Sequence, residues 1–425
     1  LLQNNSELHG SLNQLFSDGI VLIIRSEMTG KSDYLQDTKW ENSYVMHYTD
    51  TIEIHSSTSY MKSPKKDTSS STSNICAARI HRYRSALVVE EIQRPTILSP
   101  EGVLVKVGAA GLCHSDLHLI NGDWEQSLPL SLPKTPGQEI DGWVAEVGSS
   151  VPDEIFQKGD LVAVFGGWGC GLCVYCKKGD EEMCVMPKWP GLSQYDGGFS
   201  EYVLVPSYKL LVKVDRQSEL NPEQLAPLTD AGLTPYRAIK KVRHLLVPGK
   251  YIAVIGIGGL GSYAIQYARI LGSGANVVAL DLRQDKIDLA TELDADFTVK
   301  IDKADSAKDE INRITKGNGF DVVLDTVSLE STLNLGVKTL NRNGALVVVG
   351  LFGQEVRMPL FETVLKEYQM YGSLWGNYNE LREVIELAKE GELKHRIQKF
   401  ALSSVNDAIE LLCHGDITGR AVIIP

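Results

Sequence analysis

Short apolar runs separated by breaks that contain glycine and proline dominate the sequence from Cys76 to about Val205. The runs that we expect to form strands are Ala86–Glu90, Val103–Val107, Gly142–Val147, Asp160–Phe165 and Tyr202–Val205. Closely spaced short strands with turn residues between them are typical of antiparallel sheets and barrels. The pattern therefore predicts a β-rich, barrel-like domain in this part of the chain.

From about Leu233 the pattern changes, because apolar strands now alternate with segments of helical periodicity. The expected strands are Tyr251–Ile255, Asn276–Leu280, Phe320–Leu324 and Leu346–Val349, and the expected helices are Ser262–Leu271 and Asp285–Leu293. This alternation is typical of βαβ units and indicates a parallel sheet. After Trp375 we expect a further helix, Asn379–Glu390, and a closing strand, Arg420–Ile424.

Residues 1–75 show neither the alternation of a strand nor the periodicity of a helix. They are rich in Asn, Ser and Thr, as in the run Asp67–Asn74. Such a composition predicts no packed core. Neither a secretory signal nor a mitochondrial transit pattern is evident there. We expect this stretch to be a disordered or wrongly assigned extension, with Met61 as a plausible start of the protein.

The composition is that of an ordinary soluble globular protein of 425 residues, large enough for two domains. The formal net charge of −12 argues against a nucleic-acid surface. The longest apolar runs fall far short of the roughly 18 residues that a membrane span needs. We therefore expect a soluble, cytoplasmic protein with neither nucleic acid nor membrane as a partner.

A glycine-rich motif, Gly256-Ile-Gly-Gly-Leu-Gly261, follows the predicted strand Tyr251–Ile255 and opens a helix. In this context Gly256, Gly258 and Gly259 would let a pyrophosphate approach the helix N-terminus, and Gly261 would let the helix pack on the strand. The motif alone is weak evidence, but its position between strand and helix favours dinucleotide binding over an unliganded turn.

Asp281 stands at the end of the next predicted strand, directly after Leu280 and 20 residues after Gly261, where an acidic side chain can accept hydrogen bonds from the ribose hydroxyls of adenosine. Its charge should repel a 2′-phosphate, which favours NAD over NADP. Arg283 could weaken that preference, and Lys286 could reach the ribose.

Four of the seven cysteines, Cys170, Cys173, Cys176 and Cys184, lie within one short segment. Four thiolates with this spacing can close a tetrahedral shell around Zn²⁺, and a shell without an open position indicates a structural site. Two disulfides or an iron–sulfur cluster are the alternatives. We expect the isolated Cys76 and Cys413 to be buried apolar residues.

A third group of residues is dispersed between Gly111 and Pro235. The segments are Gly111-Leu-Cys-His-Ser-Asp-Leu-His118, Gly122-Asp-Trp124, Pro136-Gly-Gln-Glu139 and Pro227-Leu-Thr-Asp-Ala-Gly-Leu-Thr-Pro235. Together with the four-cysteine loop and the glycine motif, they resemble the zinc-dependent medium-chain alcohol dehydrogenases from Ala77 to Pro425. The last segment and Trp168-Gly-Cys170 are most similar to a bacterial branch active on secondary alcohols and ketones.

The resemblance implies an α/β fold with two domains: a GroES-like β-barrel catalytic domain, residues 76–231 and 376–425, and a doubly wound Rossmann NAD-binding domain, residues 232–375. It implies reversible hydride transfer between a primary or secondary alcohol and NAD, giving an aldehyde or ketone. It also implies one structural and one catalytic zinc per subunit, and a homotetramer or homodimer.

The resemblance also implies roles for single residues around the metal. Cys113 and Asp230 would bind the catalytic zinc, with Asp116 and Glu139 as carboxylates behind the ligands. Ser115 would hydrogen-bond the alcohol, and His118 would pass its proton to solvent through the ribose hydroxyls of the coenzyme.

Further residues would hold the coenzyme and the substrate. By the same resemblance, His114 and Arg420 would contact the pyrophosphate, and Trp124 and Trp168 would line the substrate pocket. Trp124 could equally belong to the core.

Gln138 departs from the family pattern, because it stands where the family has a histidine ligand. An amide oxygen is neutral, like imidazole, but it binds zinc more weakly. Glu139 could swing in as a direct ligand instead, or the site could be poor in zinc. The sequence therefore leaves two alternatives open: a zinc-poor quinone or enoyl reductase-like NAD(P)H oxidoreductase, and an NAD-binding relative without catalysis.

Overall fold

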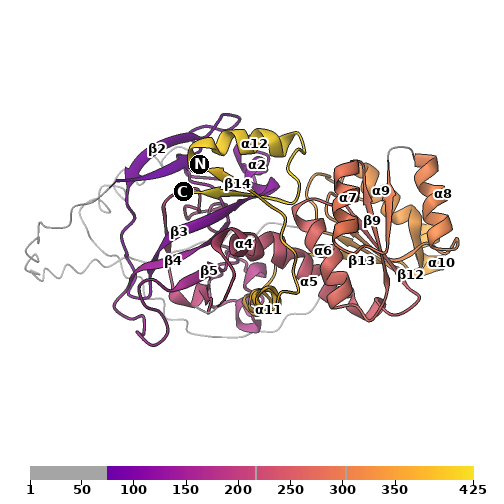
Figure 1. Cartoon of the computed structure of the whole chain (residues 1–425), viewed down its shortest axis with the longest axis horizontal. Helices are drawn as coiled ribbons and strands as arrows, with labels where there is room; N and C mark the ends of the chain where they lie inside the picture. Colours follow the sequence, from indigo (N-terminus) through magenta and orange to yellow (C-terminus); the bar gives the residue numbers. More distant parts are fainter. Residues whose placement is uncertain (1–73, 216–217, 302–303) are drawn as a thin grey trace, which may run out of the picture. The chain divides into compact units, whose positions relative to one another are not determined.

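The computed structural model describes residues 74–215, 218–301 and 304–425, and our expectations for residues 1–73, Met61 included, lie outside this part (Figure 1). Two large sheets organise the described chain. Among the described helices, none combines the length and the apolar character that crossing a membrane requires.

The first sheet has seven strands and draws on both ends of the described chain. Its strands run in the order β14-β15-β3-β4-β5-β7, and β6 pairs with β3. Their bounds are β3 Val103–Leu112, β4 Glu139–Val147, β5 Leu161–Val164, β6 Tyr202–Val205, β7 Leu211–Lys213, β14 Ile397–Ala401 and β15 Arg420–Ile424. In Figure 1 the yellow C-terminal strands lie within this indigo sheet, because β15 pairs antiparallel with β3. A separate antiparallel pair is formed by β1 Asn74–Arg79 and β2 Val88–Gln93.

The second sheet has six parallel strands in the order β10-β9-β8-β11-β12-β13. Their bounds are β8 Tyr251–Ile255, β9 Asn276–Asp281, β10 Phe297–Lys300, β11 Phe320–Asp325, β12 Leu340–Val348 and β13 Gln369–Gly372. The order reverses between β8 and β11, which makes the ends of these strands the ligand-binding crevice of a doubly wound fold. Every residue of β11 is buried, as expected for a parallel strand covered on both faces.

Helices connect and cover the strands of both sheets. Those that follow strands of the parallel sheet are α6 Gly259–Ile270, α7 Gln284–Glu292, α8 Ala304–Ile314, α9 Glu330–Thr339 and α10 Leu360–Lys366. The others are α2 His114–Asn121, α3 Val174–Lys178, α4 Pro222–Pro227, α5 Leu233–Val242, α11 Tyr378–Lys389 and α12 Val405–Cys413. Short turns of 3₁₀ helix occupy Glu181–Met183, Tyr208–Leu210, Arg243–Leu245 and Leu402–Ser404, and a π-helical turn, Leu228–Gly232, joins α4 to α5.

The predicted fold class is confirmed, and the strands Tyr251–Ile255 and Arg420–Ile424 have the bounds we expected. The strands of the parallel sheet fall between residues 251 and 372, inside the predicted coenzyme domain, while the boundaries themselves stay a prediction. The expectation for the isolated cysteines was wrong, since Cys76 and Cys413 are exposed. Cys76 alternates with the buried Ile75 and Ala77 on β1, and Cys413 ends α12 on its solvent side.

Arg237 of α5 joins three separate segments of the chain through ion pairs. Its guanidinium lies 3.1 Å from Asp180 and 2.7 Å from Glu182 in the cysteine-rich segment, and 2.8 Å from Glu380 of α11. The Arg237 side chain is only 13% exposed. Removing one member of a buried ion pair leaves the other charges uncompensated. Loss of Arg237 should therefore lower the free energy of unfolding more than loss of a residue from an exposed ion pair.

We therefore expect Arg237→Ala to lower the free energy of unfolding by about 3 kcal/mol, as measured by urea denaturation. The matched control is Arg313→Ala, which removes an exposed pair with Glu310 on α8 and should cost no more than about 0.5 kcal/mol. Equal costs for the two variants would contradict a structural role for the Arg237 cluster.

Candidate active site

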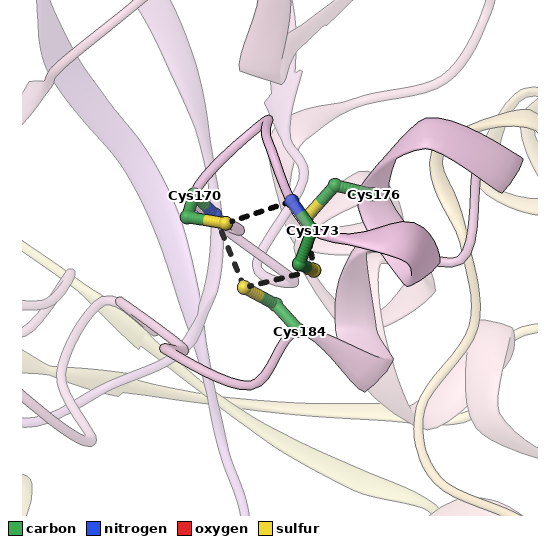
Figure 2. A group of neighbouring side chains, drawn as sticks. All are labelled: Cys170, Cys173, Cys176 and Cys184. Atoms are coloured by element: carbon green, nitrogen blue, oxygen red, sulfur yellow. Dashed lines mark hydrogen bonds between the residues drawn. The ribbon is translucent and has the colours of Figure 1, made fainter. Parts of the chain in front are cut away.

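The four clustered cysteines converge on one point, as predicted. Figure 2 shows Cys170, Cys173 and Cys176 on a loop and the start of α3, facing Cys184 from the following turn. All four Sγ atoms lie within 4.8 Å of one another. The 3.5 Å between the sulfurs of Cys173 and Cys176 is much longer than a disulfide bond, and all four thiols are free.

Backbone N–H groups point at the sulfurs, which favours thiolates. The N–H of Cys170 donates to Cys184 Sγ at 3.1 Å, and that of Leu172 to Cys170 Sγ at 3.4 Å. Hydrogen bonds of this kind lower the pKa of Cys173 to about 6, whereas burial raises that of Cys176 to about 12. A divalent cation would stabilise all four as thiolates, so the donor set fits a closed structural zinc site.

A second candidate metal site assembles from three distant segments. Cys113 precedes α2, Glu139 begins β4, and Asp230 lies in the π-helical turn before α5. The ligand atoms of these three residues lie within 4.8 Å of one another. Cys113 Sγ lies 3.9 Å from Asp230 Oδ2, although the two residues are 117 positions apart in the sequence.

Gln138 belongs to this group as well and is 1% exposed. Its Nε2 donates to Asp230 Oδ2 at 3.0 Å, whereas its Oε1 is buried and has no hydrogen-bond partner among the described residues. A buried acceptor without a donor is costly unless something fills its place. An amide oxygen next to a thiol and a carboxylate is a suitable third donor for a divalent cation, so these residues fit a metal.

Glu139 forms an ion pair with an arginine side chain. Arg420 of β15 forms a two-pronged ion pair with its carboxylate, with Nε 2.9 Å from Oε2, and the N–H of Ala231 donates to Oε1. Both Glu139 and Arg420 are buried. This pairing favours Glu139 as the charge partner of Arg420 over the alternative of a direct metal ligand.

Asp116 fixes the two backbone segments that carry the donors. Its Oδ2 accepts from the N–H of Cys113 at 2.9 Å and its Oδ1 from the N–H of Gly137 at 2.9 Å. Asp230 is oriented in turn by Thr234, whose hydroxyl donates to Oδ1 at 2.6 Å. Burial raises the pKa of the Cys113 thiol to about 11, so a cation is needed to hold this group as a thiolate near neutral pH.

The proton-handling residues predicted from the sequence lie on α2, beside the metal group. Ser115 Oγ is 3.6 Å from Cys113 Sγ. His118, one turn further along, stacks on Trp124 with 4.9 Å between ring centroids. Phe352, from the loop after β12, contacts the rings of both His114 and His118, at 5.0 and 5.3 Å.

The glycine motif lies at the switch point of the parallel sheet. Gly256 has a φ of 86°, and a Cβ at Gly261 would stand 1.9 Å from the carbonyl oxygen of Gly256, so the tight turn excludes larger residues. Gly258 caps the N-terminus of α6, and Gly259 is its first residue. Arg420 Nη1 would lie 2.5 Å from a Cβ at Gly259, which puts its guanidinium against the expected pyrophosphate position.

Asp281 lines a cavity of about 280 Å³ at the end of β8 and β9, together with Gly256 and Leu280. Its Oδ2 accepts from the N–H of Ile257 at 2.7 Å, which ties it to the glycine loop. Ile301 and Leu335 add apolar walls, as an adenine ring requires. The cavity therefore has the position and the acidic residue expected of an adenosine site.

Two predicted coenzyme residues have other partners in this structure. Lys286 donates from Nζ to the carbonyl oxygen of Ile417, and Arg283 is paired with Asp285 and Asp416. Neither cation therefore offsets the charge of Asp281 through a direct bond. His114 is largely buried, and this burial lowers its pKa to about 4, so it is neutral at pH 7 and could serve a phosphate only as a hydrogen-bond donor.

The expectation for Trp168 was wrong, because the structure places it in the core. The residue is 1% exposed, its Nε1 donates to the carbonyl oxygen of Phe165, and its ring meets Tyr195 edge-on. Trp124 is partly buried against the core and against His118, so its position at a pocket wall stays a prediction.

Sequence reasoning gave no role to Phe352, Thr234 and Asp123. Phe352 reaches the site from a loop whose proximity to α2 only the fold reveals. Thr234 had a signal, since it stands four residues after Asp230 in the segment Pro227–Pro235, which carried the resemblance. Asp123 had a signal, since it stands between Gly122 and Trp124 in a segment that carried the resemblance.

Comparisons with known proteins agree with this geometry. Residues 99–216 match the alcohol dehydrogenase GroES-like domain, and residues 259–390 match the zinc-binding dehydrogenase family. The NAD-dependent alcohol dehydrogenases of Sulfurisphaera tokodaii and Saccharolobus solfataricus are each 39% identical, over 82% of this chain and 99% of their own length.

A solved structure extends the likeness to three dimensions. The alcohol dehydrogenase of Aeropyrum pernix superposes with a TM-score of 0.77 at 37% identity, covering 82% of this chain and 100% of its own. The four-cysteine cluster, the glycine loop and these relatives together place the chain in the zinc-dependent medium-chain alcohol dehydrogenase family.

Proposed function

We propose that this chain transfers hydride reversibly between a primary or secondary alcohol and NAD, giving an aldehyde or ketone, at the site around Cys113, Gln138 and Asp230. The observation that carries the proposal is the buried, unpartnered Gln138 Oε1 beside a thiol and a carboxylate. Curated relatives that are named NAD-dependent alcohol dehydrogenase support the same reaction.

The proposal includes two zinc ions per subunit with different tasks. The four-cysteine loop would hold one ion in a closed shell that stabilises the loop. Cys113, Gln138 and Asp230 would hold the other, and two negative donors with one neutral donor balance its charge. Zinc bound there would act as a Lewis acid that lowers the pKa of an alcohol.

The remaining residues of the site would handle protons and the coenzyme. Ser115, whose Oγ lies 3.6 Å from Cys113 Sγ, would accept a hydrogen bond from the alcohol, and His118 would take up the proton. Arg420 supplies positive charge beside the glycine loop, and the neutral His114 supplies a donor. Asp281 would select NAD through the ribose hydroxyls of adenosine.

The substrate is not fixed by this arrangement, because relatives differ. A relative from Saccharolobus solfataricus that is 35% identical is named D-arabinose 1-dehydrogenase (NADP(+)). We propose a small alcohol or ketone with apolar substituents, since the side chains beside His118 are those of Trp124 and Phe352.

We further propose a homodimer or homotetramer in the cytoplasm. Strand β13 ends the described parallel sheet with one edge unpaired, and α10 exposes Leu360, Phe361 and Val364 at about four-fifths of their surface. An open sheet edge beside an apolar helix favours pairing with a second copy of the chain. Free thiols in the four-cysteine loop support a reducing compartment.

The purified protein should reduce NAD with at least one member of a panel of primary alcohols, secondary alcohols and polyols, and should hold about two zinc ions per chain. Absorbance at the NADH band and elemental analysis measure the two quantities. One zinc per chain without alcohol oxidation would contradict the proposal. In that case, reduction of an activated double bond by NAD(P)H would favour the quinone or enoyl reductase alternative, and NAD binding alone would favour the non-catalytic one.

Gln138→His should raise the affinity for the second zinc by about tenfold or more, and turnover with secondary alcohols with it, because imidazole is a better zinc ligand than an amide oxygen. Competition with a chelator and steady-state kinetics measure the two effects. The control is Gln138→Ala, which removes the donor and should empty this site while the four-cysteine zinc stays bound. Unchanged metal content and rate in both variants would show that Gln138 is not a ligand.

Asp281→Asn should raise the ratio of kcat/KM for NADP to that for NAD by about tenfold or more, since it removes the charge that repels a 2′-phosphate. The amide oxygen of Asn can still accept the hydrogen bond from the N–H of Ile257, so the loop should keep its shape. Asp285→Asn, four residues beyond the end of β9, is the control for a general change in charge. A ratio that moves equally in both variants would contradict the role of Asp281.

A further inference from the structure

The turn Gly122–Trp124, which ends α2, is built against the ring of His118. Gly122 caps the helix in the left-handed conformation, with a φ of 74°, and the N–H of Asp123 donates to the carbonyl oxygen of His118 at 2.9 Å. A Cβ on Gly122 would also approach the ring of Tyr83 to 3.0 Å. The turn therefore brings the next two side chains back over the helix that it ends.

Both of those side chains contact the imidazole. Asp123 Oδ2 lies 2.8 Å from His118 Nδ1. The indole of Trp124 stacks on one face of the ring at an interplanar angle of 26°, while Phe352 approaches at 57°. The ring is thus fixed by one hydrogen bond and two aromatic contacts, and it cannot rotate without losing them.

The hydrogen bond also determines which nitrogen carries the proton of the neutral ring. A carboxylate accepts hydrogen bonds and cannot donate them, so Nδ1 must be the protonated nitrogen and Nε2 must carry the lone pair. We propose that Asp123 is a positioning residue that holds His118 in this tautomer, with Nε2 ready to accept the proton that leaves the alcohol. The inference rests on the proposed function.

The proton balance is simple. Nε2 gains one proton from the alcohol side and the ring becomes an imidazolium, whose charge the Asp123 carboxylate offsets. The imidazolium then loses the proton on Nε2 to a water molecule and returns to the Nδ1–H tautomer. The His118 side chain is 13% exposed and that of Asp123 is 48% exposed, so solvent reaches both members of the pair.

Asp123→Asn tests the inference, because it keeps the shape of the side chain but lets it donate as well as accept. We expect kcat for alcohol oxidation to fall by about tenfold or more, and the dissociation constant of NAD to change by less than about twofold. In protein without coenzyme or alcohol, ¹⁵N spectra of labelled histidine should show the Nδ1–H form of His118 in the native chain and a larger share of the Nε2–H form in the variant. Loss of the signal in His118→Gln assigns it.

Asp153→Asn is the matched control, since it removes an exposed carboxylate from the same half of the chain and should change neither readout. An unchanged tautomer in Asp123→Asn would overturn the inference, and so would an unchanged kcat. The spectra need no substrate, so they decide whether Asp123 positions His118 even if the native protein oxidises no alcohol, an outcome that would count against the proposed function instead.

Discussion

The buried ion pair between Arg420 and Glu139 is the interaction on which the rest of the site depends. It joins the first residue of the last strand to the first residue of β4, and its guanidinium reaches the glycine loop at Gly259. Two buried charges are tolerated only when their partners are complete, so β15 must be in place before Glu139 can be buried. Through Arg420 the C-terminal strand thereby contacts both the metal group and the coenzyme loop.

The sequence predicted the parts of this site whose spacing is local. The four cysteines and the glycine motif with Asp281 each lie in a short segment, so their patterns can be recognised without a fold, whereas the role of His118 came from the resemblance. The contact between Cys113 and Asp230 required the resemblance, because 117 residues separate them. Trp168 and the exposed cysteines were misjudged because residue type alone does not tell which side of a strand or loop faces the core. Phe352 could not be foreseen, since it meets α2 only through tertiary packing.

The substitution of Gln138 for the family histidine is compensated in part by its neighbours. Its Nε2 is held by Asp230, which orients the amide and leaves Oε1 as the group without a partner. Thr234 holds Asp230 from the other side, and Asp116 holds the backbone of Cys113. A weaker ligand costs less affinity when its orientation is already fixed, because less side-chain entropy is lost on binding.

Charge explains why such a pocket suits a cation. Cys113, Asp116, Glu139 and Asp230 bring four acidic groups together against the single charge of Arg420. Burial raises the pKa of the Cys113 thiol to about 11, so this group retains near neutral pH a proton that a cation would displace, and burial raises the pKa of Asp116 to about 7. Metal binding should therefore release protons and become tighter as the pH rises. The charge of a divalent ion bound there would balance this excess of acidic groups.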